Sequence, residues 1–112
     1  MTVETVDVLY TAHATSEGGR NGTTLSGDGL VDVNLTVPKA MGGAGKAGAT
    51  TPEDLFAAGY AACFGGAVDF MGVKSGLKPS SVVIESSVGI GKTATGVGLK
   101  VDLVAKISGL SQ

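Results

Sequence analysis

The sequence predicts an α+β fold, in which strands come first, one long helix follows and further strands come last. Apolar and polar residues alternate before residue 38 and again after residue 81, as they do in half-buried strands. Between these stretches, residues 55–73 form the most apolar segment of the chain. No βαβ repeat, internal repeat or linker is visible, so we expect a single domain over residues 1–112.

Three strands are expected before the helix. The first has apolar residues at every second position, namely Val6, Val8 and Tyr10. Residues 23–26 form a second, short strand, and the glycines of residues 27–29 indicate a hairpin. Beyond this turn, apolar residues alternate until Pro38 ends the strand, at Val31, Val33, Leu35 and Val37. A glycine-rich loop follows at residues 42–48.

The helix has clear start and stop signals. Thr51 is an N-cap, Pro52 suits the first helical position, and two acids occupy the first turn. We expect the helix to run to Lys74 or Ser75 and to stop at Gly76. Its charge-free part, before Asp69, is shorter than the ~20 apolar residues that a bilayer requires. A core helix covered on most sides is therefore expected rather than a membrane span, and Asp69 has no assigned role.

Two strands are expected after the helix, joined by a turn at residues 93–96. One face of the earlier strand carries Val82, Ile84, Val88 and Ile90. One face of the later strand carries Val97, Leu99, Val101, Leu103 and Ile107.

Composition limits the possible functions. Apolar residues make up 43% of the 112 and charged residues 16%, which is an ordinary globular balance. So short a domain buries a limited fraction of its surface, which favours a dimer. The net charge of −2 and the lack of a basic cluster argue against nucleic-acid binding. One cysteine and no secretory signal are typical of a protein of the reducing cytosol.

Three residues are candidates for chemistry, each with a structural alternative. Cys63 lies in the middle of the helix, where a free cysteine is usually inert core; a reactive one needs a cation or polar network near the sulfur. Arg20 is either a solvated charge or a cationic fork that stabilises a thiolate. Glu53 either complements the helix dipole or holds Arg20 in a bidentate pair.

Helix geometry limits how these residues can combine. Glu53 and Cys63 are ten residues apart, which places them ~15 Å apart along one helix axis and about 80° apart around it. Within one helix they cannot belong to the same small site. Either an arginine bridges them or a second subunit supplies one of them, so we hypothesise an active site at a dimer interface.

Other motifs are weak. Residues 43–48 match the letters of the dinucleotide fingerprint, but no strand leads into them and no βαβ unit surrounds them. Ala47 follows Lys46 where a phosphate-binding loop requires serine or threonine. His13 is the only histidine, and a local hydrogen bond at a strand end is its expected role. We therefore predict neither a metal site nor a cofactor.

The chain resembles the organic hydroperoxide resistance (Ohr) branch of the Ohr/OsmC family. The resemblance covers essentially the whole chain and is carried by residues 9–15, 18–20, 41–45, 88–91 and 95–99, and above all by the helix segment TPEDLFAAGYAACF at 51–64. It implies an OsmC-like fold, with antiparallel sheets wrapped around a long central helix in an intertwined homodimer. It also implies a cytoplasmic enzyme that reduces organic hydroperoxides, including those of fatty acids, to alcohols.

The resemblance also assigns roles to residues. Cys63 matches the peroxidatic cysteine, Arg20 the arginine that pairs with the thiolate and positions the peroxide, and Glu53 the carboxylate that holds this arginine. Phe64 and Met71 would suit an apolar peroxide as substrate-binding residues. Dithiol reductants such as lipoylated proteins are the implied partners.

One departure concerns turnover. The family carries a second, resolving cysteine in a Val-Cys-Pro segment on a later helix, followed by a last strand, and we expect this chain to lack that helix and strand. Without that cysteine the usual disulfide cannot form, and dithiol reductants lose their usual target. Two alternatives therefore stay open: a truncated member without turnover, or a module that binds apolar ligands and has a structural cysteine.

Overall fold

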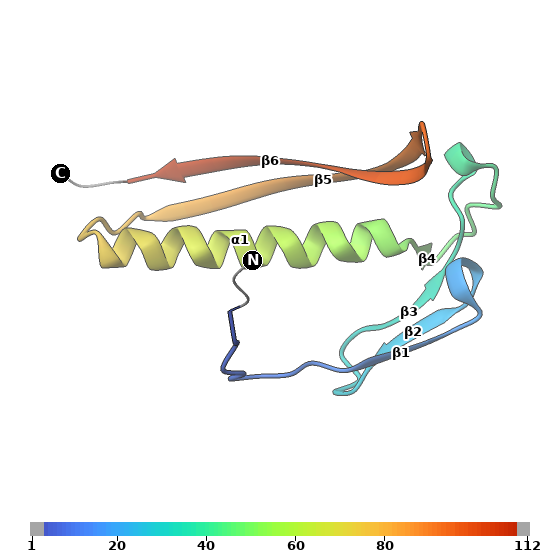
Figure 1. Ribbon diagram of the computed structural model, residues 1–112, viewed down its shortest axis with the longest axis horizontal. Coiled ribbons are helices and arrows are strands. Elements are labelled where there is room, and N and C mark those ends of the chain that lie inside the picture. Colours follow the sequence, from blue (N-terminus) through green and yellow to red (C-terminus); the bar gives the residue numbers. More distant parts are fainter. Residues whose placement is uncertain (1–3, 110–112) are drawn as a thin grey trace. The chain divides into compact units, whose positions relative to one another are not determined.

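The computed structural model describes residues 4–109, and the chain forms two compact units, Met1–Thr51 and Pro52–Gln112 (Figure 1). The first unit contains a small sheet, and the second contains one long helix and a hairpin of two long strands. This order of strands, helix and strands confirms the predicted α+β class.

The sheet of the first unit contains β1 (Ala14–Glu17), β2 (Thr23–Ser26), β3 (Asp32–Leu35) and β4 (Ala49–Thr50), in that order. The pairs β1–β2 and β2–β3 are antiparallel, and β3–β4 is parallel. The expected strands at residues 23–26 and before Pro38 are confirmed. The two-residue strand β4 was not predicted.

The prediction of a first strand at residues 6–11 is wrong. Residues 6–11 are not in a strand, and Val6, Val8 and Tyr10 are exposed. The partner strand β2 explains this result, since its last residue, Ser26, already pairs with Ala14 and the chain turns at Gly27. β2 therefore has no residue left to pair with residues 6–11, and an alternating pattern alone cannot supply a hydrogen-bonding partner.

The predicted hairpin after β2 is confirmed, and Asp28 organises its turn. The Ser26 hydroxyl and the Leu30 amide both donate hydrogen bonds to Asp28 Oδ1. These two bonds, the one from Ser26 first, hold the pKa of the Asp28 carboxyl below its usual value. The Asp28 carboxylate thus gives the Leu30 amide a hydrogen-bond acceptor within the turn.

The buried residues of the described chain lie at the end of β3. Leu35 and Thr36 are each 4% exposed. The Thr36 amide donates to the Thr50 carbonyl at 2.9 Å, and its hydroxyl accepts from the Lys46 amide at 3.1 Å. These bonds hold the predicted glycine-rich loop, which follows the short 3₁₀ helix η2 (Lys39–Met41), against the sheet.

The second unit begins with α1 (Pro52–Lys74), which starts and ends where the sequence predicts. At its end Gly76 has a φ of 77°, in the left-handed region that favours glycine. The Gly76 amide donates to the Val73 carbonyl at 3.1 Å, and the Leu77 amide to the Gly72 carbonyl at 2.8 Å. These two bonds form a Schellman motif, which reverses the chain toward the hairpin.

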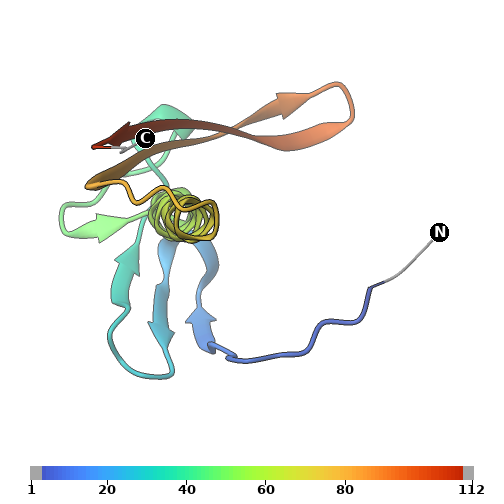
Figure 2. The ribbon, with the colours of Figure 1, turned by 90° about the vertical axis from the view of Figure 1, so that its left-hand side faces the viewer.

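The hairpin consists of β5 (Ser81–Thr93) and β6 (Gly96–Ser108), paired antiparallel along their whole length. Ile84 pairs with Ala105, and Val88 with Val101, so the two predicted apolar faces form one continuous face. Figures 1 and 2 show the hairpin lying along α1 on one side of the helix. Within this unit β5, rather than β6, is the strand that packs on α1.

The expectation that α1 is covered on most sides is wrong for the described chain. None of its residues is buried, and from Ala57 onward its half-buried residues follow one stripe toward β5: Ala57, Ala61, Phe64, Gly65, Val68 and Gly72. A single hairpin covers only one side of a helix. By length and composition α1 could also cross a bilayer, but core helices of soluble proteins meet the same criterion.

Ser86 is a polar residue within the apolar face of β5, between Ile84 and Val88. Its hydroxyl is buried without a hydrogen-bond partner, and Leu103 lies opposite on β6. Because an unsatisfied buried hydroxyl is costly, we expect Ser86→Ala to leave stability unchanged or to raise it by about 1 kcal/mol. Urea unfolding measures the change, and Ser87→Ala on the exposed face is the matched control. A clear loss of stability would mean that the hydroxyl has a partner in solution.

Candidate functional site

Cys63 is an exposed thiol in the middle of α1. With 100° between successive helical residues, it projects about 160–180° away from Ala61, Gly65 and Gly72. Those three residues belong to the half-buried stripe that packs on β5. Cys63 therefore lies on the face of α1 that points away from the hairpin.

The same face carries an exposed aromatic stripe, formed by Phe56, Tyr60 and Phe70. Together with Cys63 and Ala67 these residues follow spacings of four and three, which keep them on one side of a helix. The side chains of Phe56, Tyr60 and Phe70 are 49%, 40% and 66% exposed. The rings of Phe56 and Tyr60 meet edge to face, with centroids 5.6 Å apart and planes at 68°. The exposed thiol thus lies among apolar side chains.

The other predicted residues of this unit lie at different positions around α1. Glu53 is half-buried in the first turn, ten residues before Cys63. Phe64 is half-buried on the side of the hairpin, about 100° around the helix from Cys63. Met71 is exposed but eight residues further along. Sequence reasoning missed Phe56 and Tyr60, although their four–three spacing to Cys63 could have identified them.

Arg20 belongs to the first unit, where it is half-buried on the 3₁₀ turn η1 (Gly19–Asn21). Asn21 Oδ1 accepts a hydrogen bond from the Val37 amide at 3.1 Å, which ties this turn to the end of β3. Gly22 closes the turn: its amide donates to Gly19, and its carbonyl accepts from the Leu35 amide at 2.8 Å. The sheet therefore fixes the backbone that carries the arginine.

The weaker motifs gain no support. Among residues 4–109, no group of three or more histidine, cysteine, aspartate or glutamate side chains could hold a metal ion. The glycine-rich loop leads into the short strand β4 rather than into a helix, so it lacks the context of a dinucleotide site. His13 lies next to β1, and its carbonyl accepts from the Gly27 amide at 2.8 Å.

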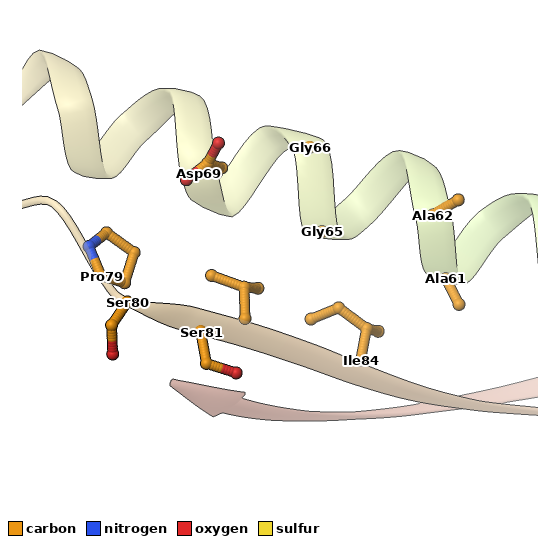
Figure 3. A pocket seen from close by; sticks show the side chains of 10 residues that line it. Ala61, Ala62, Gly65, Gly66, Asp69, Pro79, Ser80, Ser81 and Ile84 are labelled. Atoms are coloured by element: carbon orange, nitrogen blue, oxygen red, sulfur yellow. The ribbon is translucent and has the colours of Figure 1, made fainter. Parts of the chain in front are cut away.

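An open groove of about 530 Å³ lies between α1 and the start of β5 (Figure 3). Its lining includes Ala61 and Gly65 on the helix, and Ile84 on β5. Asp69 of α1 also borders the groove (Figure 3). Cys63 is not among the lining residues, so the groove and the thiol occupy different faces of α1.

No family model matches the chain. It is 50% identical over 106 residues to the organic hydroperoxide resistance protein of Xanthomonas axonopodis pv. citri (strain 306), which covers 94% of this chain and 74% of that protein. It is 39% identical over 100 residues to OhrB of Bacillus subtilis (strain 168), covering 89% and 71%. A crystal structure of an organic hydroperoxide resistance protein, OsmC, from Legionella pneumophila superposes with a TM-score of 0.83 at 42% identity, covering 95% of this chain and 77% of that one.

These matches confirm the resemblance seen in the sequence and the OsmC-like α+β fold. The chain belongs to the organic hydroperoxide resistance family of the Ohr/OsmC proteins.

Proposed function

We propose that the chain is a thiol-dependent peroxidase that reduces organic hydroperoxides, including those of fatty acids, to alcohols. The observation that carries the proposal is the Cys63 thiol, which is exposed within an apolar stripe of α1. The chain also belongs to a family named for organic hydroperoxide resistance. An exposed thiol is accessible to a peroxide, and apolar neighbours suit the organic part of such a substrate.

The proposed chemistry has one oxidised and one reduced product. The Cys63 thiolate attacks the distal oxygen of the hydroperoxide, so an S–O bond forms as the O–O bond breaks. The sulfur is oxidised to a sulfenic acid, and the alkoxide leaves with the electron pair of the O–O bond. The alkoxide then takes up a proton to become the alcohol.

Arg20 and Glu53 are proposed to assist this step. A guanidinium beside the sulfur favours the thiolate over the thiol and can direct a hydrogen bond to a peroxide oxygen. A carboxylate can orient the guanidinium through a bidentate pair. Phe64 and Met71 stay proposed as substrate-binding residues, because apolar side chains suit an organic peroxide.

The working form is proposed to be a cytoplasmic homodimer with one OsmC-like domain per chain. Large apolar side chains remain exposed on both α1 and β6, among them Phe70, Val97 and Leu99. Exposed apolar surface of this kind is typical of a protein–protein interface. A second copy would also offer a route by which Arg20 and Glu53 of one chain could serve Cys63 of another.

Regeneration of the thiol requires an external reductant in this proposal. Cys63 is the single cysteine of the 112 residues, so within them the sulfenic acid has no second thiol with which to condense. A dithiol such as a lipoylated protein could reduce the sulfenic acid in two steps, through a mixed disulfide.

Arg20→Ala tests the proposed role of the cation. The reduced protein is mixed with one equivalent of tert-butyl hydroperoxide at neutral pH, and the loss of the thiol is followed with time. We expect the rate to fall about tenfold to a hundredfold, because the thiolate loses a stabilising charge. Arg20→Lys, which keeps the charge but not the planar fork, should be intermediate.

The pH dependence of the rate of thiol loss shows why Arg20→Ala is slower than the wild type. If thiolate formation is what Arg20 assists, the rate of Arg20→Ala should approach that of the wild type in alkaline solution, where thiols ionise without help. An Arg20→Ala variant as fast as the wild type at neutral pH would contradict the role. A wild-type thiol no faster than a free small thiol would contradict the proposed function itself.

A further inference from the structure

We propose that Asn21 is a positioning residue for the reaction, which acts by fixing the turn that carries Arg20. Its side-chain oxygen joins this turn to the backbone of Val37, just beyond the end of β3. The inference rests on the proposed function, in which the Arg20 guanidinium assists the Cys63 thiolate. It adds the contact through which the first unit holds that guanidinium in one orientation.

The turn itself has little to define its conformation. Arg20 and Asn21 lie within residues 18–22, in which the other three residues are glycines. Gly18 and Gly19 have φ angles of 82° and 62°, and Gly18, at the N-cap of η1, has no side chain with which to hold the turn. Because glycine has the greatest backbone freedom of any residue, such a turn needs contacts with other segments to keep one shape.

Asn21 supplies such a contact by extending the pairing between β2 and β3. Alternate amides of a strand point to the same side, and the Leu35 amide donates to the Gly22 carbonyl at 2.8 Å. The next amide, of Thr36, donates to β4 instead. The Val37 amide points again toward η1 and donates to Asn21 Oδ1 at 3.1 Å. The side-chain oxygen thus takes the place of the next backbone carbonyl in the ladder.

Val37 is a firm anchor for this bond. It directly follows Thr36, which is buried. The Val37 carbonyl accepts from the Gly45 amide at 3.0 Å. Both polar groups of the Val37 backbone are therefore bonded, one to the glycine-rich loop and one to the turn of Arg20. A movement of the turn would break the bond to Asn21 and leave the Val37 amide without this acceptor.

The Asn21 bond affects the reaction through Arg20. A guanidinium that assists a thiolate must be held in one place and orientation, and the long arginine side chain loses rotamer freedom when it is held there. A fixed backbone at residues 20 and 21 leaves fewer degrees of freedom to restrict. Arg20 is half-buried but Asn21 is exposed, so Asn21 contributes its hydrogen bond rather than packing. Loss of this bond should slow thiol oxidation without removing the group that promotes it.

Asn21→Ala, combined with Arg20→Ala in a double-mutant cycle, tests the inference. The reduced proteins are mixed with one equivalent of tert-butyl hydroperoxide at neutral pH, and the loss of the Cys63 thiol is followed with time. We expect Asn21→Ala to lower the rate by about threefold to tenfold, the factor that corresponds to one hydrogen bond. In the Arg20→Ala background the same change should have no further effect, because the two residues act as one unit.

Two further variants separate positioning from stability. Asn21→Asp keeps an oxygen acceptor at the same place, so its rate should stay within about twofold of the wild type. Ser16→Ala is the matched control, because it removes another side chain–backbone bond of the same sheet, from the Ser16 hydroxyl to the Thr23 carbonyl at 3.1 Å. It should lower stability in urea about as much as Asn21→Ala does, and leave the rate of thiol loss unchanged.

With Arg20→Ala slow, three results would overturn the inference and leave the proposed function intact. One is an Asn21→Ala variant that keeps the wild-type rate. Another is the same fractional loss from Asn21→Ala in both backgrounds, which would make its effect independent of the arginine. The third is loss of the wild-type circular dichroism in Asn21→Ala, which would assign the bond to folding. An Arg20→Ala variant as fast as the wild type would instead overturn the inference together with the proposed role of Arg20.

Discussion

Cys63→Ser is expected to abolish the rapid consumption of organic hydroperoxides completely. Cys63 is the only cysteine in the sequence, and a serine hydroxyl is not ionised near neutral pH without an activating base. The fold should be retained, because the side chain is exposed and serine is of similar size. We expect a stability change within about 0.5 kcal/mol, as for other exposed positions.

The measurement is intact mass after one equivalent of peroxide, together with the residual thiol. The wild type should gain one oxygen, and dithiothreitol should remove it. Methionine oxidation gives the same gain, and Met41 and Met71 are both exposed, but dithiothreitol does not reverse a sulfoxide. Equally fast peroxide consumption by Cys63→Ser would contradict the proposed mechanism. Binding of the peroxide without consumption, in both proteins, would favour an apolar-ligand module.

Gly22→Ala is expected to have the largest effect on stability, a loss of more than about 3 kcal/mol, since a severe clash in a packed turn exceeds ordinary overpacking. A methyl group at Gly22 would lie 1.7 Å from the Glu17 carbonyl oxygen and 2.8 Å from Gly18 Cα. Both are backbone atoms, so no side chain can rotate away. The strand β1 or the turn η1 would have to move, and the bond from Leu35 to Gly22 would break with it.

Gly19→Ala, in the same turn, is the control. A methyl group there meets nothing within 4 Å, and only its φ of 62° is unfavourable for alanine. Its cost should be about 1–2 kcal/mol, the usual penalty of the left-handed region. Urea unfolding followed by circular dichroism gives both values. Equal stabilities for the two variants would mean that the turn can rearrange around Gly22. Because η1 carries Arg20, loss of peroxide reactivity should accompany loss of structure in Gly22→Ala.

The sequence predicted the elements whose causes are local. The ends of α1 follow from Thr51, Pro52 and Gly76, which act on the backbone within one turn. The β5–β6 face follows from a period of two, which the register preserves on both strands. Residues 6–11 have the same period but form no strand. An alternating pattern does not show whether a partner strand is available for pairing. The strand β4 was not predicted, because two residues are too few to show an alternating pattern.

The candidate site was predictable in its chemistry but less so in its geometry. Counting alone singles out Cys63, and the family resemblance adds Arg20 and Glu53. Phe64 is adjacent to Cys63 in sequence but projects toward β5, whereas Tyr60, three residues away, shares its face. Reading the helix by its period rather than by sequence proximity would have identified the aromatic stripe. Arg20 and Cys63 belong to different compact units, and no local pattern relates residues so far apart in sequence.

The two-residue turn between β5 and β6 has a consequence for how the chain acquires its structure. Thr93 pairs with Gly96, so the hairpin can close at this point and extend by one neighbouring pair at a time toward Ser81 and Ser108. Hairpins of this kind form in roughly 1–10 μs. The helix precedes β5 by only a short connection, and β5 is the strand that packs on it. The helix that carries Cys63 and the hairpin that packs on it are thus consecutive elements of one chain, and we expect them to become ordered ahead of any association between chains.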